Sequence, residues 1–207
     1  MGGALVPFLG SWTLMMAAMM LPSAMPMILL NRRVVAGPAR IQSELRTGIF
    51  VSAYLLVWAV VGIGVWVAAR ISDAFLPMGA QALAVAAILL LAGVYQFTPL
   101  KTKCLHVCRS PMDFLLTHWY PGVAGEFRLG LEHGLYCLGC CWALMAVFVG
   151  AGAMGLLWAA VIALVVFVEK VLPRGLVFGR AIGAALIGGA ALVAMQPEIA
   201  QSLAGKM

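Results

Sequence analysis

The chain has 207 residues, of which 64% are hydrophobic and only 10% are charged, and its formal net charge at pH 7 is +6. Water-soluble domains carry about a quarter charged residues, so this composition excludes an ordinary soluble domain and favours a multi-pass membrane protein. The positive charge does not indicate nucleic-acid binding, because the basic residues lie in loops between apolar runs, where they set membrane topology. The odd number of cysteines, five, argues against a closed disulfide framework.

Apolar runs of roughly twenty residues recur along the chain, and each is long enough to cross a bilayer as a helix. We therefore predict an all-α fold, a polytopic transmembrane bundle of about six helices that forms a single integral membrane domain over residues 1–207. The expected spans are about residues 5–30, 48–69, 80–97, 129–149, 156–172 and 176–195. The last run contains Gly179, Gly183 and Gly188-Gly189, which permit close contact between helices.

The basic residues are distributed unevenly between the segments that connect these runs. Residues 32–46, 101–128 and 170–180 hold four, four and three of the 13 lysines and arginines. The positive-inside rule places these three segments in the cytoplasm and both chain termini on the outer side.

The first run is rich in methionine and places Met16, Met19 and Met20 on one helical face. Pro22 and Pro26 each remove a backbone donor, and we expect them to kink or open the second half of this helix. A methionine-rich face often packs against other helices, but thioethers are also soft ligands for Cu(I). Both interpretations stay open on this run alone.

A cluster of thiols lies in the fourth run, at Cys137, Cys140 and Cys141, with His133 one turn earlier. At about 100° per residue, these four side chains fall within an arc of about 100° on one helix. Thiolate and imidazole ligands on one face suit a thiophilic metal such as Cu(I), with zinc as the alternative. The methionine face of the first run is expected at an overlapping membrane depth, so we predict that it contributes to the same site.

Residues 99–128 form the longest stretch between spans, and Pro99 is expected to stop the third helix. A short helix would place Cys104 and Cys108 on one side, with His106 directed elsewhere. A second metal-handling or entry site is our hypothesis for these three residues. The apolar and aromatic part that follows is too short to span, so we predict a re-entrant or interfacial segment there.

Glu169 is a carboxylate close to the end of the fifth apolar run. Ionisable groups inside a membrane are costly and are usually paired or functional. One interpretation is that Glu169 pairs with the adjacent Lys170 or reaches the cytoplasmic interface. The other is that it lies behind the metal ligands and supports them, or couples the site to protons.

Three blocks of sequence also occur in a characteristic order. They are Trp12 with Met15-Met16-Ala-Ala-Met19-Met20-Leu-Pro22, Tyr95 with the run from Pro99 to Pro111, and the run from Gly134 to Met145; the Glu169-Lys170 pair fits as well. In these blocks the chain resembles the bacterial domain-of-unknown-function family 2182, whose members are described as predicted metal-binding integral membrane proteins and sometimes as copper chaperones. The resemblance covers nearly the whole chain and implies a metal-binding protein of the bacterial inner membrane.

We therefore expect a protein that binds a soft metal, foremost Cu(I), and acts in copper handling or in the assembly of a membrane metalloenzyme. Its expected partners are membrane lipid and other membrane subunits or a recipient metalloenzyme. The alternatives are a permanent accessory subunit, for example of a copper-dependent membrane monooxygenase, a thiol redox protein using Cys137 and Cys140, and a metal transporter. The sequence shows no nucleotide-binding loop, catalytic triad or zinc-hydrolase motif, so we do not expect an enzyme acting alone.

Overall fold

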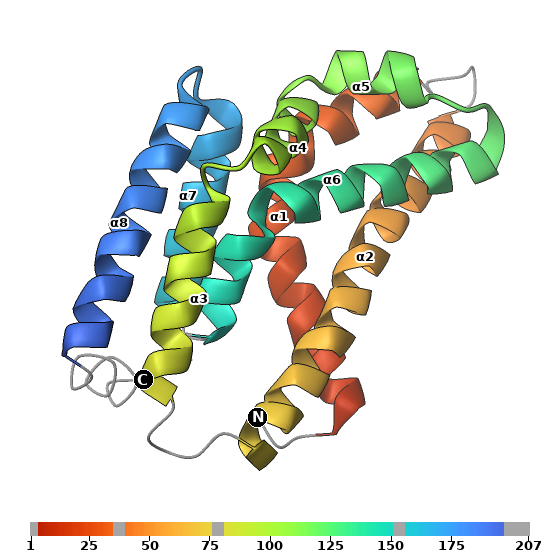
Figure 1. Cartoon of the computed structure of the whole chain (residues 1–207). Helices are drawn as coiled ribbons and strands as arrows, with labels where there is room; N and C mark the ends of the chain where they lie inside the picture. The colour runs from red at the N-terminus through yellow and green to blue at the C-terminus, as the bar shows by residue number, and fades with distance from the viewer. Residues whose placement is uncertain (1–3, 35–39, 76–80, 151–155, 197–207) are drawn as a thin grey trace. The chain divides into compact units, whose positions relative to one another are not determined.

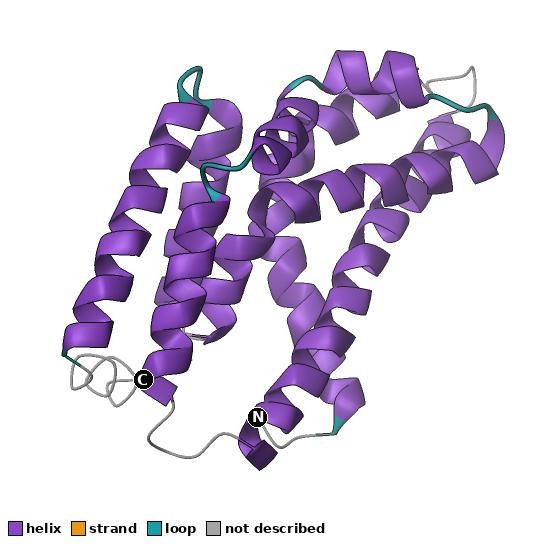
Figure 2. Ribbon diagram, in the orientation of Figure 1, coloured by secondary structure: helices purple, strands orange, loops and turns teal. Residues whose placement is uncertain are grey.

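The computed structural model describes residues 4–34, 40–75, 81–150 and 156–196. Within these ranges the chain forms eight helices and no strands, as Figure 2 shows, so the all-α prediction is confirmed. In chain order the helices are α1 (Leu5–Val34), α2 (Arg40–Phe75), α3 (Gln81–Tyr95), α4 (Pro99–Arg109), α5 (Pro111–His118), α6 (Gly122–Gly150), α7 (Leu156–Val171) and α8 (Gly175–Met195) (Figure 1).

Four of these helices, α1, α2, α6 and α8, are long and apolar enough to cross a membrane. By contrast, α3 has 15 residues and α7 has 16. At 1.5 Å per residue they measure about 22 and 24 Å, less than the hydrocarbon core of about 30 Å. A fifth span results if α3 and α4, which are bent by 65° relative to each other, are counted as one. The predicted total of about six is therefore not confirmed in the part of the chain that the structure describes.

Helix boundaries depart from the prediction where the sequence is polar. α1 continues to Val34 and α2 begins at Arg40, so most of the predicted loop between the first two runs is helical. α6 begins at Gly122, whose φ of +83° favours glycine, rather than near residue 129. These extra turns carry charged residues, and a search for apolar runs therefore does not find them.

Prolines act differently in two places. Pro22 and Pro26 lie inside α1, which is one continuous helix, so the helix is not opened there, and the alternative that the prolines kink it stays a prediction. The buried face of α1 runs past both prolines to Asn31, and its tertiary contacts hold the helix together despite the missing donors. Pro99, as predicted, separates two helices and stands at the start of α4, where a missing backbone donor is harmless.

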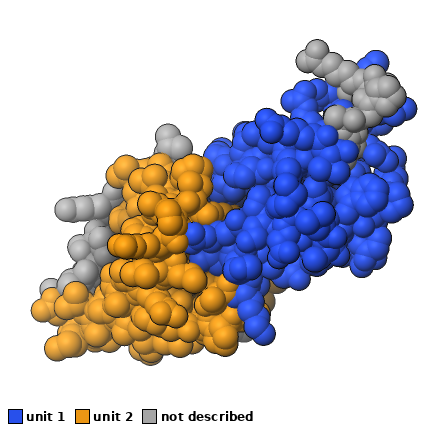
Figure 3. Space-filling model, turned by 90° about the horizontal axis from the view of Figure 1, so that it is seen from above, with its two compact units in different colours: residues 1–66, 103–139 blue, residues 67–102, 140–207 orange. Residues whose placement is uncertain are grey.

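The chain divides into two compact units, coloured separately in Figure 3. Unit 1 comprises residues 1–66 and 103–139, and unit 2 comprises residues 67–102 and 140–207. The helices α2, α4 and α6 each contribute residues to both units. The single domain expected over residues 1–207 stays a prediction.

The core of unit 1 is built from aromatic and large aliphatic side chains. One cluster of buried residues joins four helices and comprises Met27, Phe50, Phe114, Leu115 and Leu129. A second contact joins α1 to α2, where the buried Trp12 indole donates to the Trp58 carbonyl at 2.9 Å. At Gly62 on α2, a Cβ would lie 2.5 Å from the Trp12 ring, so glycine makes room for the indole. Unit 1 thus fixes the methionine-bearing helix against α2.

The core of unit 2 relies on small residues. α3 packs along α8, which also contacts α7 (Figure 1). A Cβ at Gly93 would lie 2.8 Å from the Gly183 carbonyl oxygen, so the two backbones approach more closely than any side chain allows. The prediction of close helix contact is thus confirmed at Gly183. Among the described residues, a Cβ added at Gly188 or Gly189 would have no neighbour within 4 Å, so the prediction is not confirmed at these two positions.

Candidate metal centre

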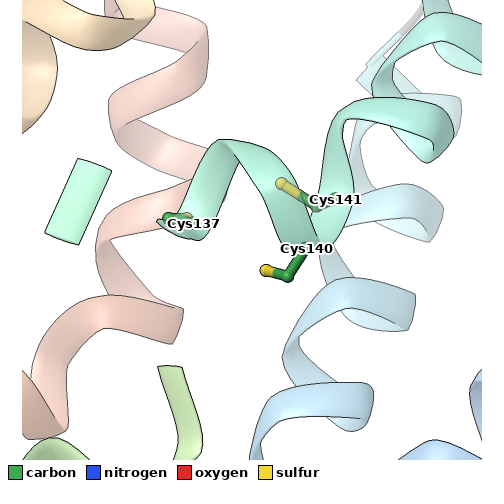
Figure 4. A group of neighbouring side chains, drawn as sticks. All are labelled: Cys137, Cys140 and Cys141. Carbon is green, nitrogen blue, oxygen red and sulfur yellow. The ribbon is translucent and has the colours of Figure 1, made fainter. Parts of the chain in front are cut away.

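Three thiols lie together on one helix, at Cys137, Cys140 and Cys141 of α6 (Figure 4). Their sulfur atoms all lie within 4.8 Å of one another. The exposed fractions of the three residues are 0%, 2% and 1%. The predicted arrangement on one helical face is therefore confirmed, because α6 continues without a break through all three positions.

The spacing of the sulfurs matches what a thiophilic ion requires. Three sulfurs in a plane around one ion, with metal–sulfur bonds of about 2.3 Å, are separated from one another by about 4.0 Å. The observed upper limit of 4.8 Å exceeds this by less than an ångström. The three sulfurs therefore lie close to the separation that one shared ion would require.

Tyr54 of α2 forms a hydrogen bond to this cluster. Its hydroxyl oxygen lies 3.1 Å from the Cys137 sulfur, and the tyrosine is fully buried. When Cys137 is a thiolate, the tyrosine donates, because a thiolate is only an acceptor. Nothing in the sequence around Tyr54 marks it as a site residue, since the contact joins positions 83 residues apart.

His133, predicted as a fourth ligand, lies one turn before Cys137 and is 2% exposed. It is not a member of the group of ligand atoms within 4.8 Å of one another. Its imidazole lies among aromatic rings instead, with centroid distances of 5.9 Å to Phe50, 5.9 Å to Tyr54 and 5.4 Å to Phe114. Its role as a ligand stays a prediction.

The predicted methionine ligands belong to the buried face of α1. Met16, Met19 and Met20 have exposed fractions of 0%, 5% and 0%. Their burial fits both of the interpretations that the sequence left open, a packing seam and a set of thioether ligands. A site shared between this face and the three thiols stays a prediction.

Cys104 of α4 approaches α6 at Gly139, the residue that precedes Cys140. A Cβ at Gly139 would lie 2.7 Å from the Cys104 sulfur, well inside van der Waals contact, so this sulfur occupies the place of the missing side chain. On α4 itself, Cys104 is buried, Cys108 is half-buried and His106 is exposed. The prediction that a short helix directs His106 away from the two thiols is confirmed.

Glu169 of α7 pairs with a lysine on α4 that the sequence does not distinguish as its partner. Lys101 donates to the two carboxylate oxygens of Glu169 at 2.8 and 2.9 Å and also to the side-chain oxygen of Gln96, and all three side chains are buried. Gly179 makes room for the pair, because a Cβ there would lie 2.5 Å from a Glu169 oxygen. Glu169 thus pairs with Lys101, and the adjacent Lys170 also interacts with its carboxylate electrostatically.

This buried ion pair and one thiol of the cluster, Cys140, belong to the same unit. Cys140 is within electrostatic range of the Glu169 carboxylate. A buried carboxylate requires a compensating cation, and Lys101 supplies it. The neighbourhood agrees with the interpretation that Glu169 stands behind the ligands, although its role there stays a prediction.

A second buried carboxylate, in unit 1, is also not evident from the sequence. Glu126 of α6 is 1% exposed and accepts a hydrogen bond of 2.9 Å from the amide nitrogen of Asn31 on α1. This contact explains why both helices extend beyond their apolar runs, since each polar side chain finds its partner on the other helix.

Comparison with known protein families gives a match that covers most of the chain. A family model described as copper chaperone (PpoB2) matches residues 9–193, a range that contains every candidate site residue. The match confirms the expectation of a copper chaperone family, while the assignment to family 2182 stays a prediction. Comparisons with curated proteins and with solved structures gave no match.

Proposed function

Given that the chain belongs to this family of copper chaperones, we propose that it binds Cu(I) through Cys137, Cys140 and Cys141 and delivers the ion to a membrane metalloenzyme during its assembly. The proposal describes a carrier and not a catalyst. The chain receives copper, holds it away from water and oxygen, and releases it to a recipient protein.

The observation that carries this proposal is the group of three buried sulfurs within 4.8 Å of one another. Soft thiolate ligands favour Cu(I) over hard ions such as Mg²⁺ or Ca²⁺. Structural zinc sites are almost always four-coordinate, whereas this group offers three sulfurs and no fourth His, Asp or Glu atom among the described residues. Three sulfur ligands therefore suit copper better than zinc.

The surroundings of the thiols support a carrier that works inside a membrane. The cluster lies on α6, one of the four helices long and apolar enough to cross a bilayer. Few water molecules reach thiols that are 2% exposed or less, which protects Cu(I) from oxidation and exchange. We place the protein in the bacterial inner membrane with its basic segments in the cytoplasm, as the charge distribution of the sequence predicts.

The proposal is tested by measuring copper in protein purified without oxygen in a mild detergent. The wild-type chain should hold about one copper ion per three-thiol group. A variant in which Cys137, Cys140 and Cys141 are all replaced by Ala should hold none, and alanine is chosen because it adds no polar atom to a buried site. Thermal unfolding in the same detergent verifies that the variant is folded. Equal copper content in the two proteins would refute the proposed site.

A further inference from the structure

The proposed copper site is closed to other proteins. Its three cysteines are at most 2% exposed, so neither a donor nor a recipient protein can bring a ligand into contact with them. Because Cu(I) prefers thiolate ligands, it passes between proteins by ligand exchange, in which an incoming sulfur binds before an outgoing sulfur leaves. Delivery of the ion therefore has two requirements. A further sulfur must lie next to the buried cluster, and another must lie closer to the protein surface.

Cys104 provides the sulfur next to the buried cluster. Its sulfur fills the position of the absent side chain at Gly139, so it lies against the stretch of α6 between Cys137 and Cys140. Any larger residue at position 139 would displace it, because even a Cβ would lie 2.7 Å from the sulfur. Cys104 is nevertheless outside the group of mutually close thiols, as expected of an exchange ligand and not of a resting one.

Cys108 provides the sulfur closer to the protein surface. It follows Cys104 by four residues on α4, so the two thiols share one face, with Cβ atoms about 5–6 Å apart. Two-coordinate copper between two sulfurs spans about 4.6 Å, twice a metal–sulfur bond of about 2.3 Å, and this pair of positions can bridge an ion. Cys108 is half-buried near the end of α4, so it is more accessible than the buried Cys104.

From this geometry we propose that Cys108 and Cys104 form a relay through which Cu(I) enters and leaves the three-thiol site. The inference rests on the proposed copper site and adds its route of access. In each step a Cu–S bond to the incoming cysteine forms as one to the outgoing cysteine breaks. The incoming thiol gives up its proton and the outgoing thiolate takes one up, so charge is conserved and copper stays Cu(I) throughout.

The test separates the rate of copper transfer from the amount of copper bound. Copper is supplied as Cu(I)–glutathione and withdrawn with bicinchoninate, and both rates are followed in the purified full-length chain. Cys104→Ala and Cys108→Ala should each bind as much copper at equilibrium as the wild type, but load and release it at least about tenfold more slowly. Wild-type protein that binds no copper would refute the proposed function itself, independently of the relay.

Two glycine variants of α6 provide a matched pair in case the cysteine variants are disturbed in folding. Gly139→Ala forces the Cys104 sulfur away and should slow transfer as much as Cys104→Ala does. Gly134→Ala introduces a similar crowding, 2.8 Å from a Val57 methyl group, and should transfer at the wild-type rate. Wild-type rates in both Cys104→Ala and Gly139→Ala would overturn the relay, and so would loss of bound copper from Cys104→Ala.

Discussion

The hydroxyl group of Tyr54 should increase the affinity of the three-thiol site for Cu(I). It lies 3.1 Å from the Cys137 sulfur in a fully buried environment. Replacing Tyr54 by Phe keeps the ring and its packing and removes only this donor. Without the donor, the negative charge on the Cys137 thiolate loses a hydrogen bond that stabilises and orients it, so copper binding becomes weaker.

The expected magnitude follows from the strength of a single hydrogen bond. Hydrogen bonds to charged groups contribute about 1.5–3 kcal/mol and neutral ones about 1 kcal/mol. Sulfur is a weak acceptor, so we take about 1–2 kcal/mol for this bond. Because about 1.4 kcal/mol corresponds to a factor of ten, Tyr54→Phe should raise the dissociation constant for Cu(I) about 5- to 30-fold.

The assay is a competition titration of anaerobic protein with bicinchoninate, which reports the dissociation constant for Cu(I) directly. Tyr120→Phe serves as the control, since Tyr120 is 40% exposed and its ring is covered by the Arg128 guanidinium, 4.2 Å from the ring centroid. The control should bind copper like the wild type. An unchanged dissociation constant in Tyr54→Phe would refute the reasoning that this hydroxyl group supports the site.

Two further predictions concern unit 2. Lys101→Met leaves the Glu169 carboxylate buried without its cation and should lower the unfolding free energy by about 3–5 kcal/mol, whereas combining it with Glu169→Gln should restore most of the loss; thermal unfolding in detergent measures both. Gly93→Ala should cost about 1–3 kcal/mol because its Cβ meets the Gly183 carbonyl oxygen, whereas Gly188→Ala, which meets nothing, should be neutral or stabilising by up to about 1 kcal/mol. Equal melting temperatures for the two alanine variants would contradict the close approach of α3 and α8.

The thiol cluster could be predicted from the sequence because its geometry is a property of one helix. Once residues 122–150 are helical, the 3.6-residue repeat alone directs Cys137, Cys140 and Cys141 to one face. The same reasoning gave the common face of Cys104 and Cys108 on α4.

The contacts that surround the cluster could not be predicted in this way, because they join residues far apart in the sequence. Lys101 and Glu169 are separated by 68 positions, and nothing in the pattern of either run distinguished Lys101 from the adjacent Lys170 as the partner. The predicted number of spans is not confirmed, for a different reason. Hydrophobicity identifies apolar runs, but it does not tell whether a run is folded as one helix long enough to cross the bilayer, and α3 and α7 are short.

The coordination of bound copper tests the central claim most directly. X-ray absorption spectroscopy at the copper edge, on anaerobically loaded wild-type protein, should show Cu(I) with three sulfur neighbours at about 2.3 Å. The same spectrum from protein lacking the Cys137, Cys140 and Cys141 thiols should show no such shell. A first shell of nitrogen or oxygen atoms in the wild type, or an unchanged sulfur shell in the variant, would contradict a copper site built from these three cysteines.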